Sequence, residues 1–239
     1  MTQQTDGMEF WEKAGEAGYL KAYGNSQSYR YVTMRIYDLA LQIADRLVIN
    51  ENSSVLDIGC GDGLFSKEYL SKKYRHVTGY DFSHASIESA KTNCPANIHF
   101  ERRDVSQLEF DPANRYDAAF LVGILHHVKK DAPGVIQRLS QVCPKIIVLE
   151  PVRNIIRILL ECLPVYKEAG EDSFYFKDLC AIFHNASYRM TECHKIGFVP
   201  NFLPDKLLPL FKIIESIMER NRVLGLLCSV RAIGLIREE

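Results

Sequence analysis

Residues 55–63 read VLDIGCGDG: an apolar run, an aspartate, and three glycines at every second position. The apolar run predicts a buried strand, and the glycines predict a turn whose backbone comes close to a neighbouring segment or a ligand. Asp57 stands near the end of the strand, where burying a carboxylate without a partner is unfavourable. The stretch therefore predicts a strand, a tight turn and a binding site at one place.

Short apolar segments and helical segments alternate along the chain after this stretch. Several apolar segments are nearly continuous runs, as expected of strands that helices cover on both faces. Strands are expected over residues 54–59, 76–81, 98–104, 116–123, 143–151, 188–197 and 230–239. Helices are expected over residues 64–74, 83–94, 132–143, 176–186 and 205–221. This alternation predicts right-handed crossovers and a doubly wound α/β fold with a mostly parallel sheet and helices on both faces.

The chain is expected to form a single domain over residues 1–239. Residues 1–50 carry apolar positions at helical spacing and form an N-terminal helical segment. Residues 51–151 form the core that carries the glycine turn. Residues 152–172 are expected to be an irregular insertion, which opens the closing part of the domain over 152–239.

Two common ligand sites that use a glycine turn do not fit these residues. A phosphate-binding P-loop needs a lysine followed by serine or threonine after its glycines, and neither follows here. A dinucleotide site needs a third glycine three residues after the second, where this chain has Leu64, and Gly63 comes one residue too early. A turn that needs glycines only for its own conformation remains as the structural alternative.

The stretch resembles the glycine motif of the class I S-adenosylmethionine-dependent methyltransferases, in which an acid is followed at alternate positions by three glycines. Residues 57–63, DIGCGDG, match this motif at every fixed position. The resemblance covers roughly residues 50–150 and is to the small-molecule, UbiE-like branch. It implies S-adenosyl-L-methionine as methyl donor, S-adenosyl-L-homocysteine (SAH) as product, and a Rossmann-like sheet of seven strands whose last strand is antiparallel.

Acidic residues at the ends of the next two strands extend the resemblance. Asp81 lies 18 residues after Gly63 (81 − 63), where an acid accepts hydrogen bonds from a ribose diol. In the family, the acid matched by Asp104 bonds the adenine amino group, although this residue also suits a cap of the following turn. The methionyl ammonium is the partner implied for Asp57. The implied cofactor-binding residues of the core are Asp57, Gly59, Cys60, Gly61, Gly63, Asp81, Phe82, Asp104, Val105, Leu121 and Val122.

Two further groups of residues take roles from the resemblance. Many small-molecule members fold an N-terminal helical lid over the cofactor, and Trp11 and Tyr23 are expected to belong to this lid; ordinary packing of the two rings is the alternative. His126 and His127 follow the fourth strand and are the candidate catalytic residues, because histidine titrates near neutral pH. A pair in which His127 only orients the backbone or the cofactor is the alternative. No metal site is expected.

The expected acceptor is a small molecule. The Asp/Asn-Pro-Pro-aromatic segment of family members that methylate bases or glutamine is missing after the fourth strand, where this chain has residues 122–125, VGIL. The Pro-Cys nucleophile of the cytosine-C5 enzymes is missing too, since Cys94 and Cys143 precede prolines. Protein and RNA acceptors remain open. The reaction needs mainly alignment and desolvation, and a general base only when the acceptor arrives protonated.

Composition is that of an ordinary globular protein. The 239 residues carry 29 basic and 30 acidic side chains, a net charge of −1, so there is no strong nucleic-acid signature. The seven cysteines form no Cys-x-x-Cys pair, which favours free thiols in a reducing compartment. The N-terminal residues lack the basic and apolar parts of a signal peptide, and the expected location is cytoplasmic.

Several alternatives stay open. The segments 152–172 and 205–228 are unusually apolar, which suits either a hydrophobic, lipid-like acceptor at a membrane surface, or packing of an extra helix layer or a dimer contact. The chain is expected to be a monomer or a homodimer. An NAD(P)- or nucleotide-sugar-dependent Rossmann oxidoreductase is the first alternative function, and Leu64 argues against it. A non-catalytic S-adenosylmethionine-binding module is the second.

Overall fold

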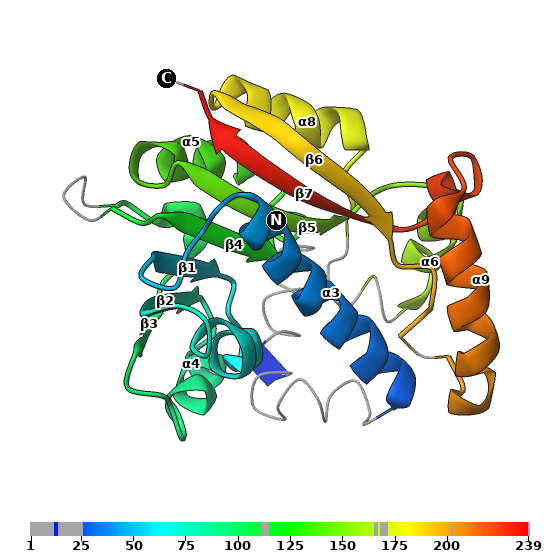
Figure 1. Ribbon diagram of the computed structural model, residues 1–239, viewed down its shortest axis with the longest axis horizontal. Helices are drawn as coiled ribbons and strands as arrows, with labels where there is room; N and C mark the ends of the chain where they lie inside the picture. Colours follow the sequence, from blue (N-terminus) through cyan, green and yellow to red (C-terminus); the bar gives the residue numbers. More distant parts are fainter. Residues whose placement is uncertain are drawn as a thin grey trace.

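The computed structural model describes residues 12–13, 26–110, 115–164, 167, 172–201 and 203–238. Within these residues, seven strands form one sheet in the order β3-β2-β1-β4-β5-β7-β6 (Figure 1). The strands are β1 (Ser54–Ile58), β2 (His76–Asp81), β3 (Ile98–Arg102), β4 (Ala118–Val122), β5 (Lys145–Pro151), β6 (Tyr188–Ile196) and β7 (Val230–Arg237). β7 runs antiparallel to β5 and β6, and the other pairs are parallel. The expected doubly wound, mostly parallel sheet with an antiparallel last strand is confirmed.

The order of the strands fixes where a ligand can bind. β1 pairs with β2 on one side and with β4 on the other, so the strand order reverses at β1. In open α/β sheets the ligand crevice lies outside the carboxyl ends of the strands at such a point. β1 ends at Ile58, and the glycine turn follows it directly. The turn therefore lies at the mouth of the crevice.

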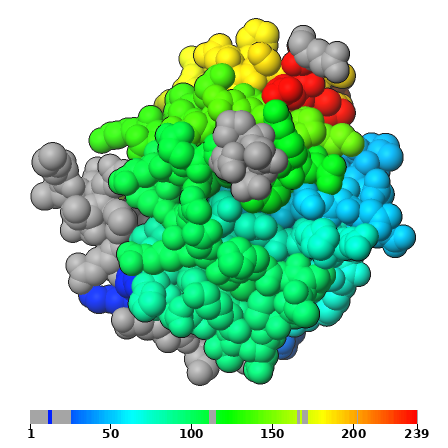
Figure 2. Space-filling model, turned by 90° about the vertical axis from the view of Figure 1, so that its left-hand side faces the viewer, coloured from blue at the N-terminus to red at the C-terminus, as the bar shows by residue number. Residues whose placement is uncertain are grey.

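Helices cover both faces of the sheet (Figure 1). α3 (Gln27–Arg46) and η1 (Ser66–Leu70) pack on one face. α5 (Ala132–Val142) and α8 (Phe176–Asn185) pack on the opposite face. α4 (His84–Lys91) lies against β2 and β3. Figure 2 shows the side of the molecule near β3, where the first half of the chain forms most of the surface and α8 lies at the top.

The last part of the chain adds a group of short helices beside the sheet, on the right in Figure 1. They are α6 (Ile155–Glu161), η3 (Asp205–Leu207), α9 (Leu208–Arg220) and η4 (Leu224–Leu227). α6 lies in the segment 152–172, which the sequence predicts to be irregular. The helix forms because Asn154 caps it: the side-chain oxygen of Asn154 accepts a hydrogen bond from the Arg157 N–H at 2.8 Å. That expectation was wrong for residues 155–161.

Local details of other helices also bear on the sequence-based expectations. The helix expected over 64–74 is wound as a π-helix at Ser66–Leu70, where the Ser71 N–H donates to the Ser66 carbonyl at 2.9 Å. Such π-turns are frequent at functional sites. Ser83 caps α4, accepting from the Ser86 N–H at 3.0 Å. Among the described residues, no helix is long and apolar enough to cross a bilayer.

Candidate functional site

The glycine turn after β1 has a left-handed backbone at all three glycines. The φ angles are 75° at Gly59, 55° at Gly61 and 77° at Gly63, a region that other residues rarely adopt. The N–H groups of Gly59 and Cys60 donate to the Tyr80 carbonyl at 2.8 and 3.0 Å. These bonds hold the turn against the end of β2. The left-handed backbone of the turn is the reason that the chain has glycine at these positions.

The three glycines have different neighbours. A Cβ atom at Gly59 would lie 2.8 Å from the Ile124 side chain, and one at Gly63 would lie 2.7 Å from the Phe100 ring. These two glycines are therefore required by packing inside the protein. Gly61 instead donates its N–H to Oδ2 of Asp81 at 2.9 Å. Of the three, Gly61 is the one whose role is tied to the predicted ligand-binding acid.

Asp57 lies inside the protein beneath the turn, with 2% of its surface exposed. Its Oδ2 accepts a hydrogen bond from the Ser66 hydroxyl at 2.6 Å. Burial raises the pKa of Asp57 to about 7, although the Ser66 bond favours the ionised form. Ser66 is a partner that the sequence did not reveal. The Asp57 carboxyl is thus held in place but lacks the full stabilisation of a buried anion.

Asp81 ends β2 and is also buried, with 7% of its surface exposed. Each carboxylate oxygen accepts one backbone N–H at 2.9 Å, Oδ2 from Gly61 and Oδ1 from Ser83. Burial raises the pKa of Asp81 to about 6 despite these two bonds. An ionised carboxylate offers about four lone-pair sites. Two accepting positions are thus unused by these bonds, which suits a pair of neighbouring hydroxyl groups.

Asp104 takes the capping position that the sequence left as an alternative. Its Oδ1 accepts hydrogen bonds from the Ser106 N–H at 2.9 Å and the Ser106 hydroxyl at 2.7 Å, which starts η2 (Val105–Gln107). Both bonds use the same oxygen, so the cap does not conflict with a ligand contact through the other. Phe82 follows Asp81 and is half-buried, and its carbonyl accepts from Nε of Arg102 at 2.8 Å.

Several predicted site residues turn their side chains into the core. The Leu121 and Val105 side chains lie in the cluster between the sheet and α5. Cys60 packs with Phe100. Contacts of these three residues with a ligand would have to come from their backbone. Val122, which ends β4, is half-buried.

Glu150, which the sequence analysis missed, organises the segment after β4. It is fully buried, and its Oε1 accepts from the N–H groups of Ile124 and Leu125 at 2.8 and 2.7 Å. Its Oε2 accepts from the His126 N–H at 3.4 Å and lies 2.8 Å from Nδ1 of His126. One carboxylate on β5 therefore fixes the backbone of three consecutive residues and one imidazole ring.

The two histidines lie side by side in the loop that follows β4. Their ring centroids are 3.9 Å apart; His126 is 5% exposed and His127 is half-buried. Since Glu150 accepts at Nδ1 of His126, the proton of a neutral His126 ring belongs on Nδ1. The Ile124 side chain, in the same loop, packs so close to Gly59 that a Cβ atom at Gly59 would overlap with it. Among the described residues, no group of three His, Cys, Asp or Glu side chains is placed to hold a metal ion.

The first half of α3 lies near the glycine turn and the residues that follow it. The Tyr37 ring stacks on Phe65, with centroids 4.5 Å apart. Burial and the nearby Asp62 carboxylate both raise the pKa of Tyr29. Further towards the N-terminus, the Glu12 carboxylate accepts from the Ala85 N–H at 3.2 Å, beside the end of β2. The expected lid residues Trp11 and Tyr23 lie outside the described residues.

A family comparison matches the part of the chain that holds this site. Residues 55–145 match the model of the methyltransferase domain. The ubiquinone biosynthesis O-methyltransferase of Coxiella burnetii is 34% identical over 96 residues, which are 39% of this chain and 40% of that protein. The chain thus matches well under half the length of this curated relative.

Solved structures extend the similarity to the whole fold. Magnesium protoporphyrin IX methyltransferase of Synechocystis PCC 6803, solved with bound SAH, aligns over 96% of this chain and 97% of its own, with a TM-score of 0.68 and 15% identity. A protein in complex with a methyltransferase activator of Haloferax volcanii aligns over 95% and 98%, with a TM-score of 0.68 and 14% identity. At these identities the likeness establishes the fold.

Proposed function

We propose that this chain, a class I methyltransferase in its fold and in residues 55–145, binds S-adenosyl-L-methionine in the crevice at the glycine turn and transfers the methyl group to a small-molecule acceptor. The observation that carries the proposal is the Asp81 carboxylate. It is buried, it is locked to the turn by Gly61, and it retains accepting positions for hydroxyl groups.

The residues of the site fit the proposed cofactor. Asp81 would accept from the ribose hydroxyls, and Phe82 beside it would pack on the adenine ring. Asp57 is a buried carboxylate at the turn, where the methionyl ammonium would supply the missing positive charge, directly or through water. Gly61 has no side chain in the way. When bound, the cofactor supplies a methyl group already activated on a sulfonium.

The protein then has to align the acceptor, exclude water and, for a protonated acceptor, receive a proton. We propose that the His126–His127 pair at the mouth of the crevice receives the proton that the acceptor loses. Glu150 fixes the orientation of His126, and the neighbouring His127 is the more exposed of the two rings. The Glu150 bonds to Ile124 and Leu125 hold the loop that carries both histidines in one conformation.

The acceptor is proposed to be hydrophobic. α6 follows β5 directly at the carboxyl edge of the sheet, and its outward side chains include Ile155, Ile158 and Leu159. The Coxiella burnetii relative is named for ubiquinone biosynthesis, and its match covers 39% of this chain. Monomer and homodimer are both compatible with this site.

Two other functions fit the fold less well. An oxidoreductase would need a helix start close to the pyrophosphate, and Leu64 occupies the position of the required glycine. A binding module without turnover would not need an ordered histidine pair, whereas here a buried glutamate holds one in place. Methyl transfer to any acceptor from a panel of phenols, catechols and lipid-linked compounds would exclude both.

Asp81→Ala is expected to weaken binding of the cofactor by about 1–3 kcal/mol, or about 5- to 150-fold, because ribose hydroxyls would lose their acceptor. Titration calorimetry with SAH measures this directly. Asp178→Ala, an exposed aspartate in the first turn of α8, is the matched control and should leave affinity unchanged. Equal affinity of Asp81→Ala and the wild type would show that the ribose site lies elsewhere.

Cofactor affinity is expected to rise as the pH is raised from about 5 to about 8, because binding favours the ionised forms of Asp57 and Asp81. Burial raises their pKa values to about 7 and about 6, so binding near these values should release protons. Calorimetry in two buffers of different ionisation enthalpy measures that release. Asp57→Asn should remove part of the proton release. An affinity for the cofactor that does not change with pH, with no proton release, would count against the roles assigned to Asp57 and Asp81.

The same two groups affect the stability of the free protein. Their folded-state pKa values lie above the unfolded value of 3.8. The stability they contribute is therefore fully present below pH 3.8 and is lost as the pH rises through about 6 and about 7. Bound cofactor should reverse this loss of stability. The increase in the free energy of unfolding caused by SAH should therefore be larger at pH 8 than at pH 5, by roughly the gain in the free energy of SAH binding between these pH values.

A further inference from the structure

The exposed apolar side chains of this protein are concentrated in one region. Among the described residues, eleven of the fourteen large apolar side chains that are exposed lie within residues 155–163, 207–217 and 223–226. Ile213 and Ile217 on α9 expose 61% and 57% of their surfaces, and Leu159 on α6 exposes 66%. Isolated exposed apolar residues are common, but a concentration of this kind marks an interaction surface.

These residues belong to elements that touch one another. The side chain of Asn154, which caps α6, donates to the carbonyls of Leu226 and Leu227 in η4 at 3.3 and 3.1 Å. Gly225 of η4 packs against the Met218 carbonyl near the end of α9. α6, η4 and α9 therefore form one surface, on the right of the molecule in Figure 1. We call the outward side of these three elements the apolar face.

α9 has apolar side chains on both its inner and its outer side, and Leu208 and Met218, 4% and 5% exposed, pack into the domain. Its inner side carries Glu215, 1% exposed, whose carboxylate accepts from the Tyr31 hydroxyl and from the N–H groups of Phe198 and Val199 and pairs with Arg35. Leu210, Ile213 and Ile217 lie on the outer side at spacings of three and four residues. A helix whose outer side faced only water would usually carry polar residues on that side.

α6 repeats this arrangement. Its inner side carries Arg157 and Glu161, which pair at 3.2 Å, and both bond Ser173. The outer side carries Ile155, Ile158 and Leu159. Both helices thus bury charged groups on their inner sides and present isoleucine and leucine outward. Packing of a buried extra helix layer, one of the two interpretations of these apolar segments, does not describe these side chains.

The exposed charges on α9 and its flanks, which form one border of the apolar face, are mainly positive. Lys206, Lys212, Arg220 and Arg222 are all exposed. Of the acids in the same stretch, Glu215 and Glu219 are engaged by Arg35, and Asp205 is the exposed one. Nζ of Lys212 lies 4.2 Å from the centroid of the Tyr31 ring, so the outward cations on the described part of α9 and its flanks are Lys206, Arg220 and Arg222.

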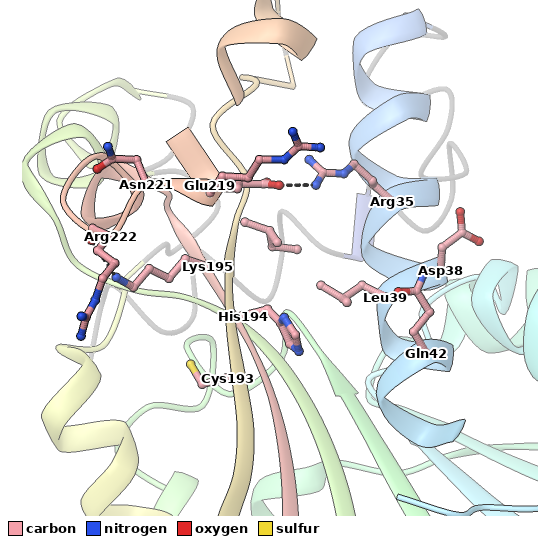
Figure 3. A pocket seen from close by; sticks show the side chains of 12 residues that line it. Arg35, Asp38, Leu39, Gln42, Cys193, His194, Lys195, Glu219, Asn221 and Arg222 are labelled. Atoms are coloured by element: carbon pink, nitrogen blue, oxygen red, sulfur yellow. Dashed lines mark hydrogen bonds and ion pairs between the residues drawn. The ribbon is translucent and has the colours of Figure 1, made fainter. Parts of the chain in front are cut away.

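A pocket of about 530 Å³ at the end of α9 continues this positive border. It lies between α3, β6 and α9, away from the glycine turn, and its lining includes Lys195, Arg220 and Arg222. Figure 3 shows Lys195 pointing towards Arg222, whose carbonyl accepts from Nζ of Lys195 at 3.1 Å, and Arg35 facing Glu219.

We propose that the apolar face docks the protein on the surface of a membrane that contains anionic lipids. Outward isoleucine and leucine would enter the boundary between headgroups and acyl chains, and the surrounding lysines and arginines would lie among the lipid phosphates. A second copy of this chain is the less suitable occupant, because a symmetric contact would bring the same cationic borders together. The inference goes beyond the proposed function, since docking needs neither cofactor nor methyl transfer.

Vesicle co-sedimentation of the full chain tests the proposal. Sucrose-loaded vesicles of phosphatidylcholine with an equal amount of phosphatidylglycerol are compared with vesicles of phosphatidylcholine alone. Wild-type protein should bind the mixed vesicles at least about tenfold more tightly, with affinity falling as salt is added. The double variant Ile213→Glu/Ile217→Glu should lose at least about tenfold in affinity, because it replaces apolar contacts with like charge. Both positions are exposed, so the fold should tolerate the change.

Val48→Glu is the matched control. Val48 is 75% exposed, and its carbonyl accepts from Lys145 at the start of β5, at the edge of the sheet opposite the apolar face. This variant should bind vesicles like the wild type. SAH affinity, measured alongside, should be unchanged in all three proteins, which separates failure of docking from failure of the methyltransferase proposal.

Three results would overturn the inference. The first is a wild-type protein that binds neither kind of vesicle. The second is an Ile213→Glu/Ile217→Glu variant that binds as the wild type does. The third is a wild-type dimer in sedimentation velocity that the same double variant converts to a monomer, since the apolar face would then be a contact between copies of this chain.

Discussion

Glu150→Ala is expected to lower the free energy of unfolding by more than about 3 kcal/mol, which makes it the most destabilising of the substitutions considered. The carboxylate is fully buried and accepts from the N–H groups of Ile124, Leu125 and His126 while it also contacts the His126 ring. Alanine would leave these donors without their acceptor in a site closed to water. Urea unfolding followed by circular dichroism measures the change.

Glu150→Gln separates the backbone bonds from the histidine contact. The amide oxygen can still accept from the Ile124 and Leu125 N–H groups, whereas the amide NH₂ would face Nδ1 of His126. We expect a smaller loss of stability than for alanine, together with an altered pH profile of methyl transfer. Glu88→Ala, at an exposed glutamate of α4, is the control. Wild-type stability of Glu150→Ala would mean that the loop after β4 does not depend on this carboxylate.

Gly61→Val is expected to reduce cofactor affinity by more than about 100-fold, to the limit of detection. Gly61 has a φ of 55° and lies at the mouth of the crevice, where its N–H bonds Asp81. A branched side chain would enter the space assigned to the ligand and would strain the backbone by about 1–3 kcal/mol. Titration calorimetry with SAH measures the loss.

Backbone strain alone has to be separated from blocking of the crevice. Asn93 has a φ of 52° and is exposed in the turn after α4, outside the site. Asn93→Val should therefore lower the melting temperature in the same way while binding SAH like the wild type. If Gly61→Val kept its affinity, or if Asn93→Val lost affinity equally, the ligand would not approach the turn at Gly61.

The sheet could be predicted from the sequence because each strand is marked by residues that are neighbours in the chain. Continuous apolar runs bounded by polar residues marked each strand, and the alternation with helices fixed the order of connections. The glycine turn was equally local, since Gly59, Gly61 and Gly63 need the left-handed backbone that the structure has. Asp57 and Asp81 could be found because each is a charge at the end of an apolar strand.

What the sequence did not reveal depends on contacts between distant segments. Glu150 is also a charge at the end of an apolar strand, in KIIVLEP, but its partners lie 24 to 26 residues away on the neighbouring strand's loop. Ser66 became a partner of Asp57 only through the winding of η1. α9 has apolar residues on both sides, and the sequence does not say which of them are exposed. The contacts of Glu215 with the N–H groups of Phe198 and Val199 help to set which side faces inward.

Titration of the 239-residue chain with SAH, followed by titration with NAD, tests the central claim most directly. We expect saturable one-to-one binding of SAH that is weakened in Asp81→Ala, and no binding of NAD. Saturable binding of NAD without any binding of SAH would contradict the assignment of the crevice to S-adenosyl-L-methionine.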